Sequence, residues 1–261
     1  MSQPLYVIKI GGNVIDNPEA CSRFLRSFAH IKGPKILVHG GGKIATQIAA
    51  RLQIETRMVE GRRITDKPML DVVTMVYGGL VNKNLVAQLQ ALGCNAIGLT
   101  GADGGIIRSV RRPVKTIDYG FVGDIEAVNG EQIHAILGSS LIPVIAPLTY
   151  STSGDLLNTN ADTMASVTGV AMSEFYEVNL IYCFEKKGVL SDPDDDTAVI
   201  AALNLDSYHF YKSTGVINKG MIPKLDNAFD ALQAGISKVM ICHADDLIEA
   251  IDSEAGTAIT L

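Results

Sequence analysis

Short apolar runs alternate along this chain with stretches that have the hydrophobic period of an amphipathic helix. Strands are expected at residues 5–10, 35–39, 96–100, 141–145, 179–184, 238–241 and 257–261, and helices at 18–30, 43–52, 67–92, 131–137, 161–170, 204–212, 223–234 and 245–251. This alternation favours an α/β fold in which helices cover both faces of a largely parallel sheet. Residues 101–129 interrupt it with short β segments and turns, which predict a flap or a hairpin edge.

The 261 residues are enough for one large domain or two lobes. We expect two lobes that share one continuous sheet, 1–172 and 173–261. The apolar runs are shorter than a membrane span requires and the first residues lack a signal-peptide pattern, so a cytoplasmic protein without membrane contact is expected. The four cysteines are scattered and interpreted as core thiols. The net charge of −6 disfavours nucleic acid as a partner and means that an anionic substrate needs a local cationic site.

The stretch ILVHGGGKIATQIAARL, residues 36–52, places a histidine and three glycines between a strand and a helix. An HGGG loop serves as an oxyanion hole in esterases, but the chain lacks the G-x-S-x-G nucleophile elbow that such an enzyme needs. The same glycines formally match a dinucleotide fingerprint, a weak signal that leaves the earlier glycine turn KIGGN unexplained. A glycine turn before a helix also binds phosphate groups, and no Walker A sequence is present. His39 itself is interpreted as a packed strand-end residue.

Further glycine and cationic segments lie where predicted strands end or helices begin. They are KIGGN, GRRITD, NTNAD and NKGMIPK. Because strand ends at one edge of a parallel sheet converge on a ligand crevice, two glycine turns there could hold a phosphate group that passes between two molecules.

These segments, together with VHGGGK and TGADGG, occur in the order and approximate spacing of the amino acid kinase family, and the whole chain most closely resembles its N-acetylglutamate kinase branch. The resemblance implies an open α/β/α sandwich with a mainly parallel central sheet, the carbamate kinase-like fold. It also implies that the N-terminal lobe binds an acyl-amino acid and mediates dimerisation, and that the C-terminal lobe binds ATP. The reaction implied is phosphoryl transfer from ATP to the side-chain carboxylate of N-acetyl-L-glutamate, in arginine biosynthesis.

The resemblance assigns the catalytic roles to Lys9, Lys224 and Asp162. The two lysines would bind and stabilise the phosphoryl group in transfer, and Asp162 would position both lysines by pairing with them. Gly11 and Gly12 would donate backbone N–H groups to ATP phosphates.

The acyl-amino acid would be bound by Gly41, Gly42, Arg63, Asn158 and Asn160. The glycines would donate backbone N–H groups, and Arg63 would hold the α-carboxylate with its planar fork. Asn158 would hydrogen-bond the substrate backbone, and Asn160 would help to close the same loop.

Three more residues are assigned to ATP: Glu185, Gly188 and Lys219. Glu185 lies in CFEKKGVL, where the family commonly has T-D-V-x-G, so the contacts to adenine and ribose differ from the usual pattern. Mg²⁺ is expected on the ATP phosphates, with no side chain named as its ligand.

Alternatives within the same chemistry are N-succinylglutamate or an aminoadipate derivative as substrate, and the alternative of another class is a catalytically silent ligand-sensing subunit. The sequence begins directly at the first strand, without the extra helix of arginine-inhibited hexamers. The expectation is therefore a homodimer without arginine feedback, with dimer contacts through the helix at 67–92.

Overall fold

The computed structural model describes residues 3–59, 61–192, 194–217 and 220–261. Contacts within the chain define two compact units: unit 1, Met1–Ile36 with Ala165–Leu261, and unit 2, Leu37–Met164. The first strand and helices thus group with the C-terminal part of the chain. This division by contacts is separate from the expected division into binding lobes, which stays a proposal.

Unit 1 is an α/β assembly. Its elements are β1 (Pro4–Ile10), α1 (Gly12–Ile15), α2 (Pro18–His30), β11 (Glu177–Phe184), β12 (Ala202–Leu203), α8 (Leu205–Ser213), α9 (Ile222–Gln233), β13 (Lys238–His243), η3 (Ala244–Asp246), α10 (Leu247–Ile251) and β14 (Thr257–Ile259). The strand order is β12-β14-β13-β11-β1. β1, β11 and β13 pair in parallel, whereas β14 runs antiparallel to β13. The sheet of this unit is therefore mainly parallel, as predicted.

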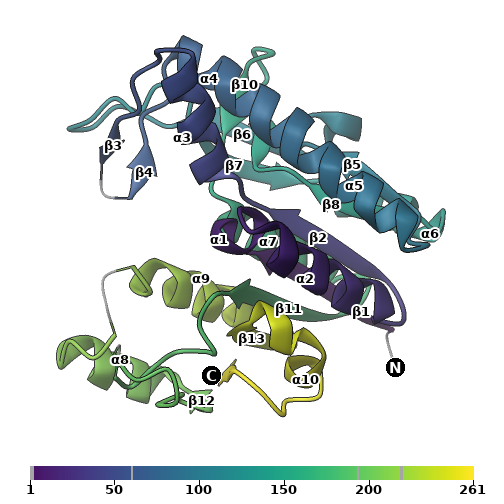
Figure 1. Cartoon of the computed structure of the whole chain (residues 1–261), viewed down its shortest axis with the longest axis vertical. Coiled ribbons are helices and arrows are strands. Elements are labelled where there is room, and N and C mark those ends of the chain that lie inside the picture. Colours follow the sequence, from purple (N-terminus) through teal and green to yellow (C-terminus); the bar gives the residue numbers. More distant parts are fainter. Residues whose placement is uncertain (1–2, 60, 193, 218–219) are drawn as a thin grey trace. The chain divides into compact units, whose positions relative to one another are not determined.

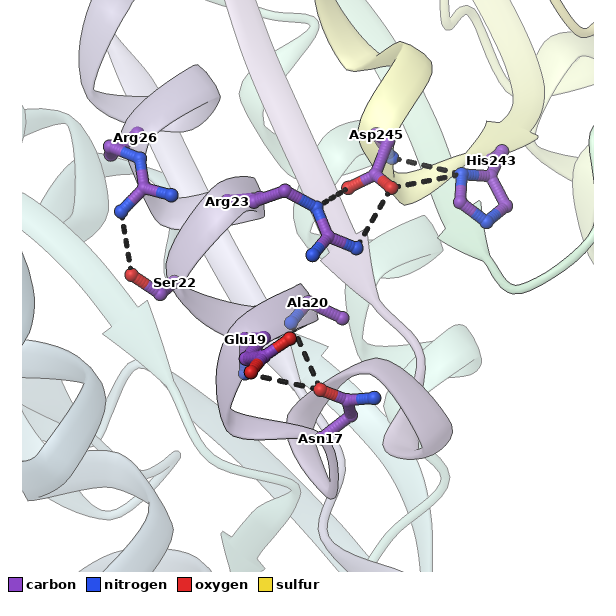
Figure 2. Close-up of polar contacts among 8 residues, drawn as sticks. All are labelled: Asn17, Glu19, Ala20, Ser22, Arg23, Arg26, His243 and Asp245. Carbon is purple, nitrogen blue, oxygen red and sulfur yellow. Dashed lines mark hydrogen bonds and ion pairs between the residues drawn. The ribbon is translucent and has the colours of Figure 1, made fainter.

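Local sequence explains why α2 begins and packs where it does. The Asn17 side-chain oxygen accepts hydrogen bonds from the backbone N–H groups of Glu19 and Ala20, and Pro18 occupies the first turn. Figure 2 shows that Arg23 of α2 binds the carboxylate of Asp245 in η3 through two hydrogen bonds, of 3.0 and 3.1 Å. The pair is half-exposed, so it orients the two helices and adds little stability.

Unit 2 contains a parallel three-stranded segment and a second, smaller sheet. Its elements are α3 (Gly42–Arg51), β3 (Met58–Val59), β4 (Arg62–Arg63), α4 (Lys67–Val73), η1 (Thr74–Val81), α5 (Asn82–Ala91), β5 (Ala96–Leu99), η2 (Asp103–Gly105), β6 (Ile107–Arg111), β7 (Gly123–Val128), α6 (Gly130–Gly138), β8 (Ile142–Ile145), β9 (Leu148–Tyr150) and β10 (Leu156–Asn158). Two elements reach across the division between the units, β2 (Lys35–His39) and α7 (Ala161–Met172). The parallel segment has the order β2-β8-β5, and the second sheet has the order β10-β9-β6-β7.

The expected hairpin edge in residues 101–129 is confirmed, because β6 and β7 pair antiparallel. The long helix expected at residues 67–92 runs from Lys67 to Ala91 and is drawn in Figure 1 as one continuous coil from α4 to α5. Its middle third, Thr74–Val81, is a π-helix, which the sequence did not predict. The short strands β3, β4, β9, β10 and β12 and the single turn α1 had no sequence prediction, because two to four residues are too few to show a period.

All four cysteines are buried and unbridged, as predicted. Within the described ranges, no helix combines the length and apolar character needed to cross a bilayer.

Candidate active site

Two lysines that are far apart in sequence meet at the end of the unit 1 sheet. Lys9 is the second-last residue of β1 and is 7% exposed, and its ammonium lies 4.7 Å from the centroid of the Phe184 ring. Lys224, in the first turn of α9, places its ammonium 3.6 Å from the same centroid. The structure therefore brings together two of the three residues predicted to be catalytic, around one aromatic side chain.

Sequence reasoning missed Phe184. It ends β11, the parallel neighbour of β1, and Ile10 pairs with Cys183 in that register. The residues that follow this pair, Gly11 and Phe184, therefore lie side by side. The Gly11 N–H donates to the Cys183 carbonyl at 2.8 Å. The position of Phe184 at the carboxyl end of a buried strand was the available signal. An aromatic face attracts ammonium groups, which explains why both lysines lie over it.

The first glycine turn joins β1 to α1 and differs in its surroundings from one residue to the next. A Cβ on Gly11 would lie 3.1 Å from the Phe184 ring and 3.2 Å from the Cys183 carbonyl oxygen, so this glycine permits close packing. A Cβ on Gly12 would meet no atom within 4 Å. The backbone at Gly12 therefore borders open space, as a phosphate-binding turn requires.

The residues assigned to ATP from the CFEKKG segment lie in the same unit. Glu185 accepts a hydrogen bond of 2.6 Å from the side-chain amide of Asn13, which ties this segment to the glycine turn. Gly188 contributes to a small recess whose lining, among the described residues, also includes Lys186, Val189, Leu190, Val216, Ile217 and Met221. A Cβ on Gly188 would also lie 2.6 Å from the Thr257 hydroxyl, so a close packing contact requires glycine there. Lys219 lies outside the described residues.

The second glycine turn, in unit 2, precedes α3. Gly41 has φ +149°, a conformation that L side chains rarely adopt, and a Cβ there would lie 3.2 Å from both Tyr77 and Val81. Its carbonyl accepts the first helical hydrogen bond, from the Ala45 N–H at 3.0 Å. The turn is thus fixed on one side by the helix and on the other by side chains of η1.

Arg63 is bound to this same turn. The hairpin strand β4 leaves Arg62 exposed and buries Arg63, as alternation along a strand requires. The Arg63 Nη2 donates to the Gly42 carbonyl and to the Thr46 hydroxyl, each at 2.9 Å. The structure therefore brings Gly41, Gly42 and Arg63 together at the N-terminus of α3.

The predicted asparagines take different local roles. The Asn158 amide donates to the Thr65 hydroxyl at 2.9 Å, two residues beyond Arg63. The Asn160 side-chain oxygen accepts from the N–H groups of Asp162 and Thr163, at 2.8 and 3.0 Å, and so caps α7. Asp162 is buried in the first turn of α7. Its pairing with Lys9 and Lys224 stays a prediction.

Comparison with known proteins gives the family. The model of the amino acid kinase family matches residues 4–243. The chain belongs to this family. An acetylglutamate kinase from Cytophaga hutchinsonii is 59% identical over 251 residues, covering 96% of this chain and 95% of the relative. One from Bacteroides fragilis is 53% identical over 259 residues, covering 99% and 98%.

A solved structure agrees on the fold of this amino acid kinase. Carbamate kinase from Giardia lamblia superimposes with a TM-score of 0.71 at 14% identity, covering 99% of this chain and 98% of that one. The predicted fold class is thereby confirmed. The two relatives also carry the name of the branch that the sequence motifs resemble, so the suspected family is confirmed.

Proposed function

We propose that this kinase transfers the γ-phosphoryl group of ATP to the side-chain carboxylate of N-acetyl-L-glutamate, giving an acyl phosphate for arginine biosynthesis. The observation that carries the proposal is the convergence of Lys9 and Lys224 on Phe184 beside a glycine turn. The names of the two relatives support the choice of substrate.

The chemistry calls for charge neutralisation and alignment. The substrate carboxyl group has an ordinary pKa of about 4.3 and is ionised at neutral pH, so it needs no general base. One carboxylate oxygen forms a bond to the γ-phosphorus while the bond from that phosphorus to the β–γ bridging oxygen breaks, and ADP leaves with the electron pair. Lys9 and Lys224 would stabilise the negative charge on the phosphoryl oxygens during transfer.

Residues of unit 1 fit the nucleotide. The open space beside Gly12 leaves room for a phosphate to approach the backbone. The recess beside Gly188 is lined by apolar side chains and by Lys186, a composition that suits an adenine ring and a nearby anion. Mg²⁺ bound to the ATP phosphates would neutralise part of their charge, and the protein would supply Lys9, Lys224 and backbone N–H groups around it.

Residues of unit 2 fit an acyl-amino acid. The Gly41 and Gly42 N–H groups lie beside the Arg63 guanidinium and form with it a compact set of donors for carboxylate oxygens. In the structure Arg63 Nη2 donates to Gly42 and Thr46 and Nη1 donates to the Thr56 hydroxyl at 3.4 Å, so a bound carboxylate would share or replace these partners. Asn158 adds an amide whose orientation is fixed by Thr65. We assign these donors to the substrate, with Arg63 on the α-carboxylate.

The direct test traps the product. The purified protein is incubated with Mg-ATP, hydroxylamine and one acyl-amino acid per reaction: N-acetylglutamate, N-succinylglutamate or N-acetylaminoadipate. Hydroxylamine converts any acyl phosphate to a hydroxamate, and the coloured iron complex of the hydroxamate is measured. Signal with N-acetylglutamate alone is the expected result. Preference for another acyl-amino acid changes the substrate and keeps the chemistry. Folded protein without signal on any of the three refutes the proposal and indicates either another substrate of the amino acid kinase family or the silent ligand-sensing subunit.

The exposed apolar side chains on the long helix support a homodimer. Met75 is 55% exposed and Leu80 is 47% exposed on η1. Burying them against a second copy would remove apolar surface from water. Sedimentation that shows only monomer at micromolar concentration would refute this assembly. The cytoplasmic location stays a prediction.

A further inference from the structure

His39 is a buried histidine at the end of β2 with a defined partner on each ring nitrogen. Its Nδ1 lies 2.8 Å from the Gly40 carbonyl oxygen, and its Nε2 lies 3.0 Å from the side-chain amide nitrogen of Asn82. An amide nitrogen only donates, so Nε2 accepts. The proton is therefore on Nδ1, which donates to Gly40. Complete burial lowers the pKa of the imidazole to about 4, and the ring is neutral at neutral pH.

The orientation of Asn82 is fixed independently. Its amide nitrogen also donates to the Val144 carbonyl at 2.8 Å, and its oxygen accepts from the Lys83 ammonium at 3.1 Å. A Cβ on Gly98 would collide with the Asn82 side chain, so Asn82 packs directly against the backbone of β5. This framework holds the imidazole in one tautomer and one orientation.

The hydrogen bond from His39 has a consequence one atom further along the chain. The Gly40 carbonyl and the Gly41 N–H belong to one planar trans peptide, in which they point in opposite directions. A donor that fixes the carbonyl therefore fixes the direction of the Gly41 N–H as well. The helix does not do this, because its first hydrogen bond is accepted by the Gly41 carbonyl and orients only the following peptide.

We propose that His39 is a positioning residue, which orients the Gly41 N–H toward the substrate by donating from Nδ1 to the Gly40 carbonyl. The inference rests on the proposed function, since it deepens the role assigned to the second glycine turn. His39 is fully buried and would act through the Gly40–Gly41 peptide, without contact to the reacting atoms.

Two substitutions separate the two ring nitrogens. His39→Asn places an amide nitrogen near the position of Nδ1 and keeps the bond to Gly40, whereas His39→Gln reaches the position of Nε2 and keeps the bond to Asn82. We expect His39→Gln to lower kcat/KM for N-acetylglutamate about tenfold, as for one misaligned hydrogen bond to a charged group, with KM for ATP within twofold. His39→Asn should retain most of the wild-type kcat/KM for N-acetylglutamate. Val38→Ala, a buried neighbour, is the stability control and should lower Tm without this selective loss.

The outcomes separate the inference from the proposed function. Wild-type protein that forms no acyl phosphate refutes the proposed function and, with it, the inference. Active wild-type protein with equal losses in the Asn and Gln variants, or with none, refutes the inference alone. If neither variant folds, ¹⁵N spectra of the wild-type imidazole decide: a proton on Nε2 overturns the proposal, and a proton on Nδ1 with a Gly41 amide signal that shifts on adding N-acetylglutamate supports it.

Discussion

Lys9 and Lys224 lie over the same aromatic ring, with their ammonium groups 4.7 and 3.6 Å from the centroid of Phe184. Bringing two positive charges together costs free energy, and the negative face of the ring offsets part of that cost. A phosphoryl group bound by both ammonium groups, as proposed, would lower that cost further. We therefore expect this pair of lysines in unit 1 to bind an anion, and the predictions below test this.

Replacement of either lysine tests this directly. Lys9→Ala and Lys224→Ala should each lower kcat by about 10² to 10³, because each removes a cation that stabilises the transferred group. The hydroxamate assay measures the loss, and circular dichroism checks the fold.

The matched control is Lys32→Ala, an exposed lysine in the same unit, which should keep its activity. If Lys9→Ala retained wild-type kcat, the proposed role of Lys9 in phosphoryl transfer would be wrong.

Arg63→Lys should raise KM for N-acetylglutamate about 10- to 100-fold and change KM for ATP little. A lysine ammonium cannot hold the Gly42 carbonyl, the Thr46 hydroxyl and a carboxylate with the fixed geometry of a guanidinium. Steady-state kinetics with each substrate varied in turn gives both constants. The neighbouring Arg62→Lys, on the exposed side of the hairpin, is the control, and an equal rise of KM in both variants would contradict the assignment.

Gly12→Ala should leave Tm unchanged and raise KM for ATP at least tenfold. The added methyl group meets no protein atom within 4 Å, so only a bound phosphate would be displaced. Gly188→Ala, by contrast, should lower Tm by several degrees. Its Cβ would lie 2.6 Å from Thr257 Oγ1 and 2.9 Å from Val199 Cγ1, which is too close. Thermal unfolding with and without ATP measures both effects. Unchanged affinity for ATP in Gly12→Ala would remove the first glycine turn from the phosphate site.

Stability should fall in acid because of His39. Its pKa is about 4 in the folded protein and about 6.5 when unfolded, so the unfolded chain binds more protons between these values. The free energy of unfolding therefore decreases as pH falls from about 6.5 to about 4, by on the order of 3 kcal/mol. Urea unfolding of wild type and His39→Asn across this range isolates the contribution, since asparagine does not titrate. Parallel pH profiles of the two proteins would show that His39 keeps an ordinary pKa.

The sequence was sufficient for the long elements and for the two glycine turns. A buried parallel strand such as β1 or β11 is a continuous apolar run, and α2 carries both a cap and a hydrophobic stripe, so their positions follow from local physics. The motif segments placed Lys9, Lys224 and Arg63 at element ends, where the structure has them.

The site residues that the sequence did not predict depend on contacts between distant residues. Phe184 gains its position from strand register, and Thr46 becomes a partner of Arg63 only when the β3–β4 hairpin packs on α3. From the sequence alone, Asn82 is expected to be an ordinary polar residue on a helix. In the structure it is 1% exposed and hydrogen-bonded to His39. The hydrophobic periodicity of the sequence carries no signal for a hydrogen bond between residues 43 positions apart.

The π-helix at Thr74–Val81 affects His39 through Asn82. Asn82 directly follows it, so the wider turns of the π-helix determine the angle at which Asn82 leaves the helix axis. Return of the same eight residues to α-helical geometry would turn the chain through about 100° per residue, more than the wider π-helical turn gives. The helix that follows would then rotate relative to α4 and carry Asn82 away from His39. A change of helix type within Thr74–Val81 would thereby remove one of the two hydrogen-bond partners of the His39 ring.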